Sequence, residues 1–225
     1  MSIIELNNVG KIYKTKNQPD VVALDSVNLS VIEGGFLSIC GVSGSGKTTL
    51  LNLIACLDKP SSGDVIIAGN NTVKMNQTQL AHMRNRIVSM VLQEFGLISS
   101  RTVYENILVP FYFSKERLSK KDIDGRILIA MEKTGITDLK DRVVSKLSGG
   151  QRQRVAIARA IVNDTQIILA DEPTGQLDSK TKREIADLFI ELNQNGKTII
   201  MVTHDNEIAQ IASQIVYIKD GKLFQ

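Results

Sequence analysis

A glycine-rich segment near the start of the chain has the spacing of a phosphate-binding loop. Residues 41–48 read Gly-Val-Ser-Gly-Ser-Gly-Lys-Thr and match the pattern G-x-x-x-x-G-K-[ST]. Glycines let successive backbone N–H groups point at phosphate oxygens, while Lys47 can reach the β- and γ-phosphates and Thr48 can ligate Mg²⁺. The residues expected to bind nucleotide are Gly41, Ser43, Gly44, Ser45, Gly46, Lys47, Thr48 and Thr49.

An apolar segment, residues 167–170, ends in two adjacent acids. Neighbouring carboxylates at the end of a buried strand destabilise each other unless a cation is near. The pattern therefore predicts that Asp171 ligates Mg²⁺ and that Glu172 polarises a water molecule that attacks the γ-phosphate. A solvated strand end is the structural alternative.

Three further polar or aromatic residues lie where a ligand is expected. Gln93 follows the predicted strand 87–92, where its amide can sense Mg²⁺ or the attacking water. His204 follows strand 198–203, at the sheet edge where α/β proteins bind ligands. Tyr13 can stack on a base. Taken singly, the histidine and the tyrosine are each more often packed or surface residues than parts of a site.

The pentapeptide Leu-Ser-Gly-Gly-Gln at 147–151 precedes a helical segment. A helix start with a hydroxyl and two glycines presents free N–H groups to an anion, although an ordinary helix cap has the same residues. One chain does not need two such sites for one nucleotide. The functional interpretation is that Ser148, Gly149 and Gly150 contact the γ-phosphate held by a second copy of the chain.

Strands and helices must alternate to position these residues. Strands are expected at 3–9, 21–24, 27–31, 36–40, 65–68, 87–92, 167–170, 198–203 and 215–218, and helices at 48–57, 80–86, 102–111, 120–134, 151–162 and from Ser179 to Gly196. Ser179 is expected to cap the helix that it begins, a short helix is expected between strands 198–203 and 215–218, and Asp220-Gly221 is expected to form a hairpin turn. The alternation predicts an α/β fold with a mainly parallel sheet, interrupted by an inserted helical subdomain.

The composition excludes several classes of protein. Lys and Arg exceed Asp and Glu by 27 − 24 = +3, without a basic run of five, so no nucleic-acid partner is expected. No window approaches the roughly 18 apolar residues of a membrane span, and the N-terminus lacks a signal peptide. The two cysteines lie in apolar runs as buried thiols. We expect a cytoplasmic protein.

Together, these motifs resemble the ATP-binding-cassette (ABC) ATPases over essentially the whole chain. The order of the phosphate loop, Gln93, the pentapeptide, Asp171-Glu172, Asp178 and His204 carries the resemblance. It implies one nucleotide-binding domain, 1–225: a P-loop NTPase core of about 1–92 and 164–225 with an N-terminal antiparallel β subdomain, and a helical subdomain of about 93–163. It also implies a homodimer with two ATP molecules, and Mg²⁺, between its subunits.

The resemblance implies a role for each matching residue. Tyr13 stacks on adenine, and Gln93 is the lid glutamine that couples to the membrane partner and contacts the metal. Ser148 to Gln151 form the contact made across the dimer, and Asp178 lies in the loop between subunits. Glu172 is the general base and His204 the switch at the γ-phosphate, so Lys47, Gln93, Glu172 and His204 form the catalytic set.

Longer stretches resemble one branch of the family. Residues 50–65, 102–110, 169–181 and 198–205 look like the MacB-, LolD- and FtsE-like ATPases, which serve macrolide, lipoprotein and peptide exporters with FtsX-type permeases. Gln176 departs from the Asn, Ala or Ser usual there, and Leu92 from the usual Phe. The second departure bears on which permease is bound rather than on activity.

Three functions remain open from the sequence. The first is the ATPase of an exporter, held at the inner face of the cell membrane by a separate permease. The second is a regulatory or mechanotransmitting ATPase in a cell-division or antibiotic-sensing complex. The third, a soluble cassette ATPase of DNA repair or translation, is disfavoured because the chain has no long coiled coil, zinc site or second cassette.

Overall fold

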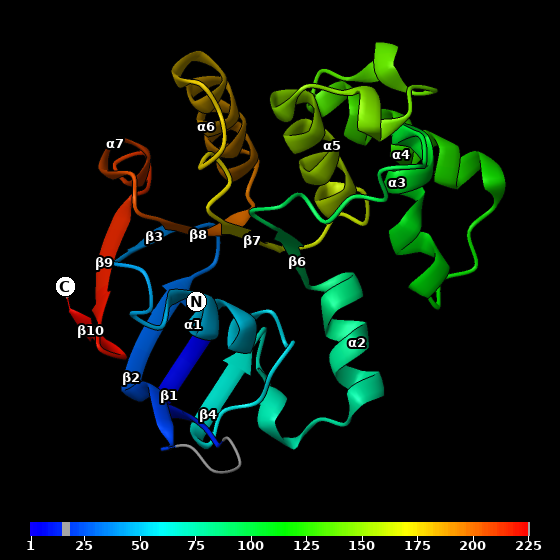
Figure 1. The fold of residues 1–225 in the computed structure, drawn as a ribbon. Helices are drawn as coiled ribbons and strands as arrows, with labels where there is room; N and C mark the ends of the chain where they lie inside the picture. The colour runs from blue at the N-terminus through cyan, green and yellow to red at the C-terminus, as the bar shows by residue number, and fades with distance from the viewer. Residues whose placement is uncertain (15–18, 225) are drawn as a thin grey trace.

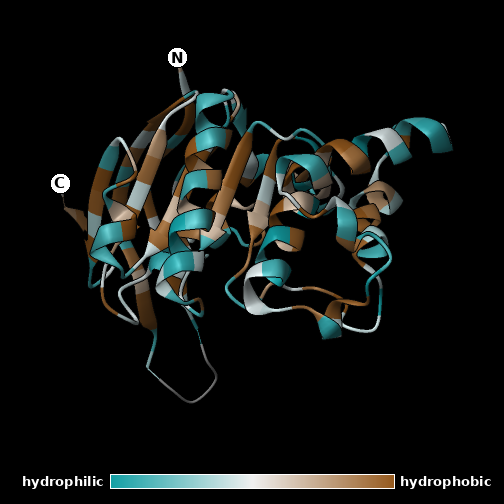
Figure 2. Cartoon of the chain, turned by 90° about the horizontal axis from the view of Figure 1, so that it is seen from above, coloured by the Kyte–Doolittle hydropathy of each residue, from teal (hydrophilic) through white to brown (hydrophobic). Residues whose placement is uncertain are grey.

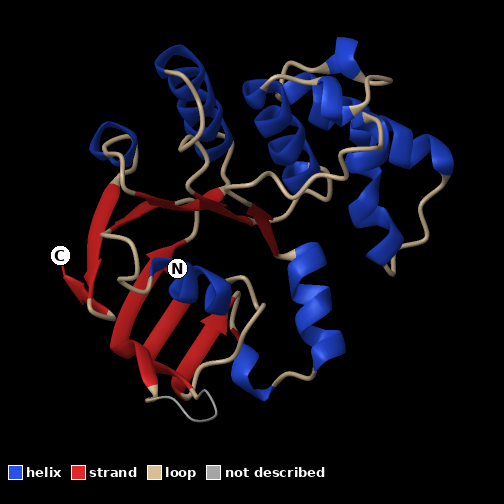
Figure 3. Ribbon diagram, in the orientation of Figure 1, coloured by secondary structure: helices blue, strands red, loops and turns tan. Residues whose placement is uncertain are grey.

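The structure is a computed structural model that describes residues 1–14 and 19–224. The described chain contains a four-stranded sheet and a six-stranded sheet (Figures 1 and 3). The smaller sheet has the order β2-β1-β4-β5 and is antiparallel. Its strands are β1 (Ser2–Tyr13), β2 (Val21–Ile32), β4 (Ser62–Ile67) and β5 (Asn70–Asn71).

The larger sheet has the order β10-β9-β3-β8-β7-β6. Its strands are β3 (Phe36–Cys40), β6 (Val88–Val91), β7 (Ile167–Asp171), β8 (Thr198–Thr203), β9 (Gln214–Lys219) and β10 (Lys222–Phe224). All neighbouring pairs are parallel except β9 and β10, which the predicted turn joins. Asp220 and Gly221 both have positive φ, 49° and 75°, as a tight hairpin of this twist requires. The predicted mainly parallel sheet and hairpin are confirmed.

The larger sheet is covered on both faces, and its strands show why. Side chains alternate across a strand, so Ile168 and Ala170 enter one hydrophobic cluster while Ile167 and Leu169 enter the other. The first cluster lies under α5 (Gly149–Ile161), α6 (Ser179–Gln194) and α7 (Asn206–Ala209). The second joins the larger sheet to α1 (Lys47–Ile54) and the antiparallel sheet. Figure 1 shows these layers, with α6 above the sheet and α1 below it.

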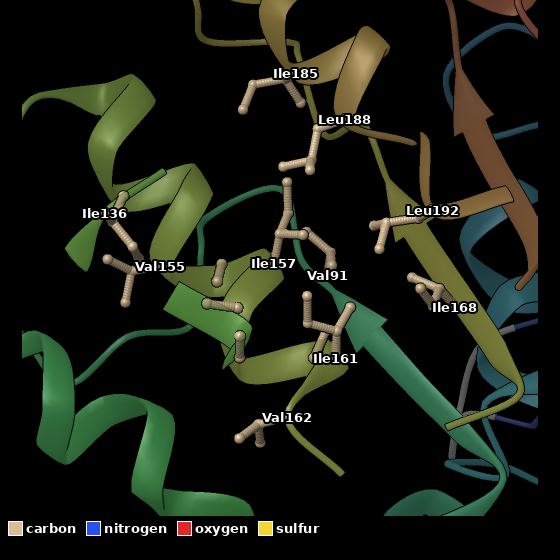
Figure 4. Close-up of a cluster of buried hydrophobic side chains, with 14 of the residues drawn as sticks. Val91, Ile136, Val155, Ile157, Ile161, Val162, Ile168, Ile185, Leu188 and Leu192 are labelled. Atoms are coloured by element: carbon tan, nitrogen blue, oxygen red, sulfur yellow. The ribbon is translucent and has the colours of Figure 1, made fainter. Parts of the chain in front are cut away.

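Helices gather at one side of the molecule (Figure 1). They are α3 (Val103–Leu108), α4 (Lys120–Lys133) and α5, while α2 (Gln77–Arg86) leads into β6. Ile157 and Ile161 of α5 lie in the same cluster as Val91 of β6 and Leu188 of α6 (Figure 4). The helix after the pentapeptide is therefore packed directly against the sheet that carries the acidic pair.

Three local predictions are wrong. Strands 21–24 and 27–31 form the single strand β2, because Ser26 adopts a positive φ of 52° at a shift in register and the ladder continues past it. Helix 102–111 ends at Leu108, because Pro110 has no N–H for the next helical bond, and a 3₁₀ turn follows. Asp178, not Ser179, caps α6, accepting hydrogen bonds from the amides of Lys180 and Thr181.

Hydrophobic and hydrophilic residues both occur along the helices (Figure 2). In α6 the buried residues Ile185, Leu188 and Leu192 form one apolar face. Within residues 1–14 and 19–224, no helix combines the length and the apolar character needed to cross a bilayer.

Replacing Phe189 by Ala tests the packing of α6. The side chain is fully buried, so the variant should lose about 3–5 kcal/mol of the free energy of unfolding through lost transfer energy and a cavity. Asp187→Ala, an exposed position on the same helix, should change stability by less than about 0.5 kcal/mol. Urea unfolding measures both, and equal losses would contradict the described orientation of α6.

Candidate nucleotide-binding site

The phosphate loop connects the buried strand β3 to helix α1. Every residue of β3 is buried, and its parallel neighbours β8 and β9 fix where the strand ends. Gly46 caps α1 with a φ of 109°, which a residue with a side chain rarely adopts. The free N–H groups at the start of α1 therefore face the loop, and the helix dipole adds positive potential there.

Two glycines of the loop have no room for a side chain. A Cβ at Gly41 would lie 2.3 Å from the carbonyl oxygen of Ile218 in β9. A Cβ at Gly46 would lie 2.5 Å from the carbonyl oxygen of Ala23 in β2. The loop thus lies against strands of both sheets, which leaves its backbone as the cradle for an anion.

Lys47 lies largely buried within this loop. Its ammonium group donates hydrogen bonds to the carbonyl oxygens of Gly41, at 2.7 Å, and Val42, at 2.8 Å. The Ser45 hydroxyl is buried with no hydrogen-bond partner among residues 1–14 and 19–224, while its carbonyl oxygen accepts from the amide of Gly221 at 3.0 Å. The ammonium group of Lys47 places a cation at the loop, as phosphate binding requires.

The acidic pair closes the opposite side of the site. Glu172 follows β7 with a φ of 46°, and its amide donates to the carbonyl oxygen of Val202 at 2.9 Å. Its carboxylate Oε1 lies 2.8 Å from Nδ1 of His204, which is itself exposed. The left-handed backbone turns this carboxylate away from the strand direction and toward the histidine.

Asp171 has a raised pKa for reasons that bear on metal binding. Burial raises the pKa of this carboxyl and the nearby Glu172 charge raises it further, while Lys47 lowers it. The ionised form is therefore disfavoured in the protein alone. A divalent cation would reverse this effect, because an opposite charge favours the carboxylate.

Most of the predicted site residues line one pocket of about 800 Å³. Its lining includes Tyr13, Ser43, Gly44, Gly46, Lys47, Thr48, Thr49, Gln93, Asp171, Glu172 and His204. Gly41 and Ser45, which belong to the same loop, are not part of this lining. Sequence reasoning missed Val21 and Val22, which line the pocket beside Tyr13 as exposed apolar residues at the start of β2. No polar motif marks them, although two exposed valines at a strand start are a usable signal.

The pentapeptide lies outside this pocket and begins α5. The Ser148 hydroxyl accepts a hydrogen bond from the Gln151 amide at 3.3 Å, and the Gln151 side chain accepts one from the Ser148 amide at 3.0 Å. This reciprocal arrangement is a capping box, readable from the S-x-x-Q spacing but not anticipated for Gln151. Gly150 packs against α6, where an added Cβ would lie 2.5 Å from Cγ2 of Thr181.

Asp178 also lies outside the pocket, beside the pentapeptide helix. Its carboxylate accepts hydrogen bonds from the Thr181 hydroxyl at 2.6 Å and from two amides at the start of α6. The Thr181 side chain therefore contacts both Asp178 and the edge of Gly150. The structure thus brings the pentapeptide 147–151 and the loop before α6 together within one chain, outside the lining of the pocket.

Comparisons with known proteins agree on one family. The family model described as "ABC transporter" matches residues 24–175. The ABC transporter ATP-binding protein YvrO of Bacillus subtilis is 45% identical over 98% of this chain and 95% of its own length. The chain belongs to the ABC transporter family. It is an ATPase domain of that family and binds ATP.

Solved structures of this ABC family have the same fold. A dimeric structure of the MJ0796 cassette in a post-hydrolysis state, bound to ADP and Pi, superposes with a TM-score of 0.91 at 41% identity, covering 99% of this chain and 97% of that one. The P-loop ABC ATPase fold, with its antiparallel sheet and helical subdomain, is thereby confirmed.

Some relatives of this ABC domain carry more than an ATPase. The macrolide export ATP-binding/permease protein MacB of Syntrophobacter fumaroxidans is 41% identical over 98% of this chain, which spans 31% of that protein. The ABC transporter ATP-binding protein MJ0796 of Methanocaldococcus jannaschii is 44% identical, and the aligned region covers 98% of this chain and 95% of MJ0796. The similarity thus extends both to stand-alone cassettes and to the ATP-binding part of larger proteins.

Asp171→Asn should raise the free energy of unfolding at neutral pH, measured without nucleotide or metal. The change removes a carboxylate whose charge is opposed by burial and by Glu172. Because the folded pKa is raised, the penalty is present above that pKa and disappears as the pH falls through it. The gain from the substitution should therefore shrink in acid, as urea unfolding at several pH values would show.

Asp178→Asn is the matched control with the opposite sign. Hydrogen bonds from the Thr181 hydroxyl and amide lower the pKa of Asp178, so its contribution is lost only as the pH falls through the folded pKa. This variant should be less stable than the wild type at neutral pH. An Asp171→Asn protein that is also less stable at neutral pH would contradict the proposed electrostatics.

Proposed function

We propose that this chain is the ATP-hydrolysing subunit of an exporter and powers a separate permease of the FtsX or MacB type. The observation that carries the proposal is that one pocket is lined by all of Lys47, Thr48, Asp171, Glu172 and His204. It combines a phosphate cradle, oxygen ligands for a hard cation and a carboxylate–histidine pair. ATP hydrolysis needs these three parts.

Binding of the triphosphate falls to the loop and its lysine. Backbone N–H groups at 43–48 surround the β-phosphate, and Lys47 moves from its loop carbonyls to the β- and γ-phosphate oxygens. Thr48, Asp171 and the amide of Gln93 supply oxygen ligands that fit Mg²⁺. When bound, Mg²⁺ neutralises the charge that develops on the phosphates. Tyr13 stacks on the adenine at the other end of the pocket.

Glu172 acts as the general base of the hydrolysis. Its carboxylate accepts a proton from the water that attacks the γ-phosphate, while Gln93 orients that water. Nδ1 of His204 lies 2.8 Å from the carboxylate and holds Glu172 in place, and the other ring nitrogen contacts the γ-phosphate. The 11% exposure of the Glu172 side chain keeps bulk water from competing for this carboxylate.

A second copy of the chain completes each site. Ser148 to Gln151 and Asp178 lie outside the pocket of their own chain, although Ser148 is exposed at the positive end of α5. Placed head to tail, these residues of one copy contact the γ-phosphate held by the other. Support comes from the MJ0796 cassette, which was solved as a dimer at 42% identity to this chain.

The permease binds in a groove of about 570 Å³ beside β6, the strand that precedes Gln93. The groove is bordered by α2, by β6 and by the turn at Val109–Phe113, where Phe113 is 74% exposed. Arg159 lines it and donates hydrogen bonds to the carbonyl oxygens of Phe95 and Gly96, in the loop that follows Gln93. Movement in the groove is thereby transmitted to the nucleotide site.

The proposed division of the domain into a core and a helical subdomain also bears on this coupling. The core comprises about 1–92 and 164–225, and the helical subdomain about 93–163. The groove and Gln93 lie where the core and the helical subdomain meet, so rotation of one subdomain against the other couples hydrolysis to the permease.

The permease then holds the subunit at the inner face of the membrane. Peptides, antibiotics or lipoprotein-like molecules are the proposed cargo, supported by the MacB relatives named for macrolide export.

Glu172→Gln should bind ATP, hydrolyse it at least about a hundredfold more slowly and form an ATP-dependent dimer. The amide keeps the shape of the side chain but loses the base, and the γ-phosphate that both copies contact is retained. Light scattering with and without ATP measures the dimer, and phosphate release measures turnover.

Adding Ser148→Arg provides the matched control for this dimer. The larger side chain blocks the contact with the partner's phosphate while leaving the nucleotide pocket of its own chain unchanged. The double variant should bind ATP and stay monomeric. A Glu172→Gln protein that stays monomeric at high ATP and protein concentrations would contradict the shared site, and transport in reconstituted vesicles would separate an exporter from a signalling complex.

A further inference from the structure

Tyr13 is held from outside the nucleotide pocket by a carboxylate and an ammonium group. Its hydroxyl donates a hydrogen bond to Oδ2 of Asp58 at 3.1 Å. The other oxygen of Asp58 accepts from Nζ of Lys11 at 2.7 Å, and the same ammonium donates to the carbonyl oxygen of Lys59. Asp58 lies in the segment after α1, so the cluster joins β1 to that segment.

Lys11 also contacts the aromatic ring. Its ammonium nitrogen lies over the ring of Tyr13, 4.9 Å from the centroid. A cation in this position draws electron density to the face it covers, which makes the opposite face a better surface for an electron-rich purine. Tyr13 lines the pocket, whereas neither Lys11 nor Asp58 does.

The charged pair is built into the fold rather than lying free on the surface. The side chain of Lys11 is only 12% exposed and that of Asp58 is 32% exposed. Partial burial raises the pKa of Asp58, but hydrogen bonds from Lys11, from the amide of Lys59 and from Tyr13 lower it by more, so the carboxylate stays ionised. Among the described residues, this carboxylate accepts from the ammonium that covers one face of the Tyr13 ring and from the hydroxyl at the edge of that ring.

We propose that Asp58 and Lys11 are positioning residues for nucleotide recognition: they fix the ring of Tyr13 as a preoriented platform for the base. This inference rests on the proposed binding of ATP in the pocket and extends it to two residues outside the lining. A platform held by a hydrogen bond and a covering cation loses less rotamer freedom when the base binds. Asp58 and Lys11 therefore strengthen the binding of the base but not that of the phosphates.

The test compares ATP with a probe that has no base. Affinities of MgATP and of inorganic tripolyphosphate with Mg²⁺ are measured by calorimetry for the wild type, Asp58→Ala, Tyr13→Ala and the double variant. Asp58→Ala should weaken ATP binding about five- to tenfold and leave tripolyphosphate binding unchanged. In the Tyr13→Ala background, Asp58→Ala should cause no further loss, because the carboxylate acts through that ring.

A control separates positioning from folding. Asp64 lies on β4 of the same sheet and accepts a hydrogen bond from the Asn71 side chain, so Asp64→Ala removes a comparable contact away from the pocket. It should leave both affinities unchanged. Asp58→Asn, which keeps the shape of the side chain, replaces Asp58→Ala if the latter unfolds, and it should show a smaller loss in the same direction.

Several outcomes would overturn the inference. They are equal weakening of ATP and tripolyphosphate by Asp58→Ala, full additivity with Tyr13→Ala, and unchanged ATP binding in Asp58→Ala or Tyr13→Ala. In each case ATP binding by the wild type still supports the proposed function. Failure of the wild type to bind ATP would overturn the proposed function, and the inference with it.

Discussion

The close approach of the phosphate loop to strands of both sheets is the constraint on which the rest of the site depends. Gly41 lies against β9 and Gly46 against β2, each too near a carbonyl oxygen for a side chain. The amide of Gly221, in the turn after β9, is bonded to Ser45 in the same loop. Because both sheets hold the loop, its backbone N–H groups are oriented before a phosphate arrives, which lowers the ordering cost of binding.

The larger sheet places Asp171 and Glu172 opposite the phosphate loop. β7 and β3 are both neighbours of β8, so Asp171 and the start of the phosphate loop emerge at the same edge. Glu172 then adopts a left-handed backbone, which directs its carboxylate to His204 on the loop after β8. The parallel order of the strands, more than any single contact, brings Lys47 and Asp171, 171 − 47 = 124 positions apart, into one pocket.

Much of this arrangement could be predicted from the sequence, because its signals are local. The phosphate loop, the acidic pair, Gln93 and His204 each follow an apolar strand, and parallel strands end at one edge. Features set by tertiary contacts were not predictable in this way. The continuity of β2 past Ser26 depends on its pairing with β1, whereas the cap of α6 at Asp178 is made by the nearby Lys180 and Thr181 amides and could have been predicted from the sequence. The hold of Asp58 on Tyr13 joins residues 45 apart, with no motif to mark it.

The central claim is that each ATP site is shared between two copies, and mixing two inactive variants tests it most directly. Lys47→Ala removes the lysine that contacts the phosphates in its own chain. Ser148→Arg removes only the contact with the γ-phosphate held by the partner copy. Each variant alone has two damaged sites per dimer. A mixed dimer places both defects in one site and leaves the other intact, so ATP hydrolysis should appear on mixing the two inactive proteins. Turnover that stays at the level of the separate variants, although mixed dimers form, would contradict the account.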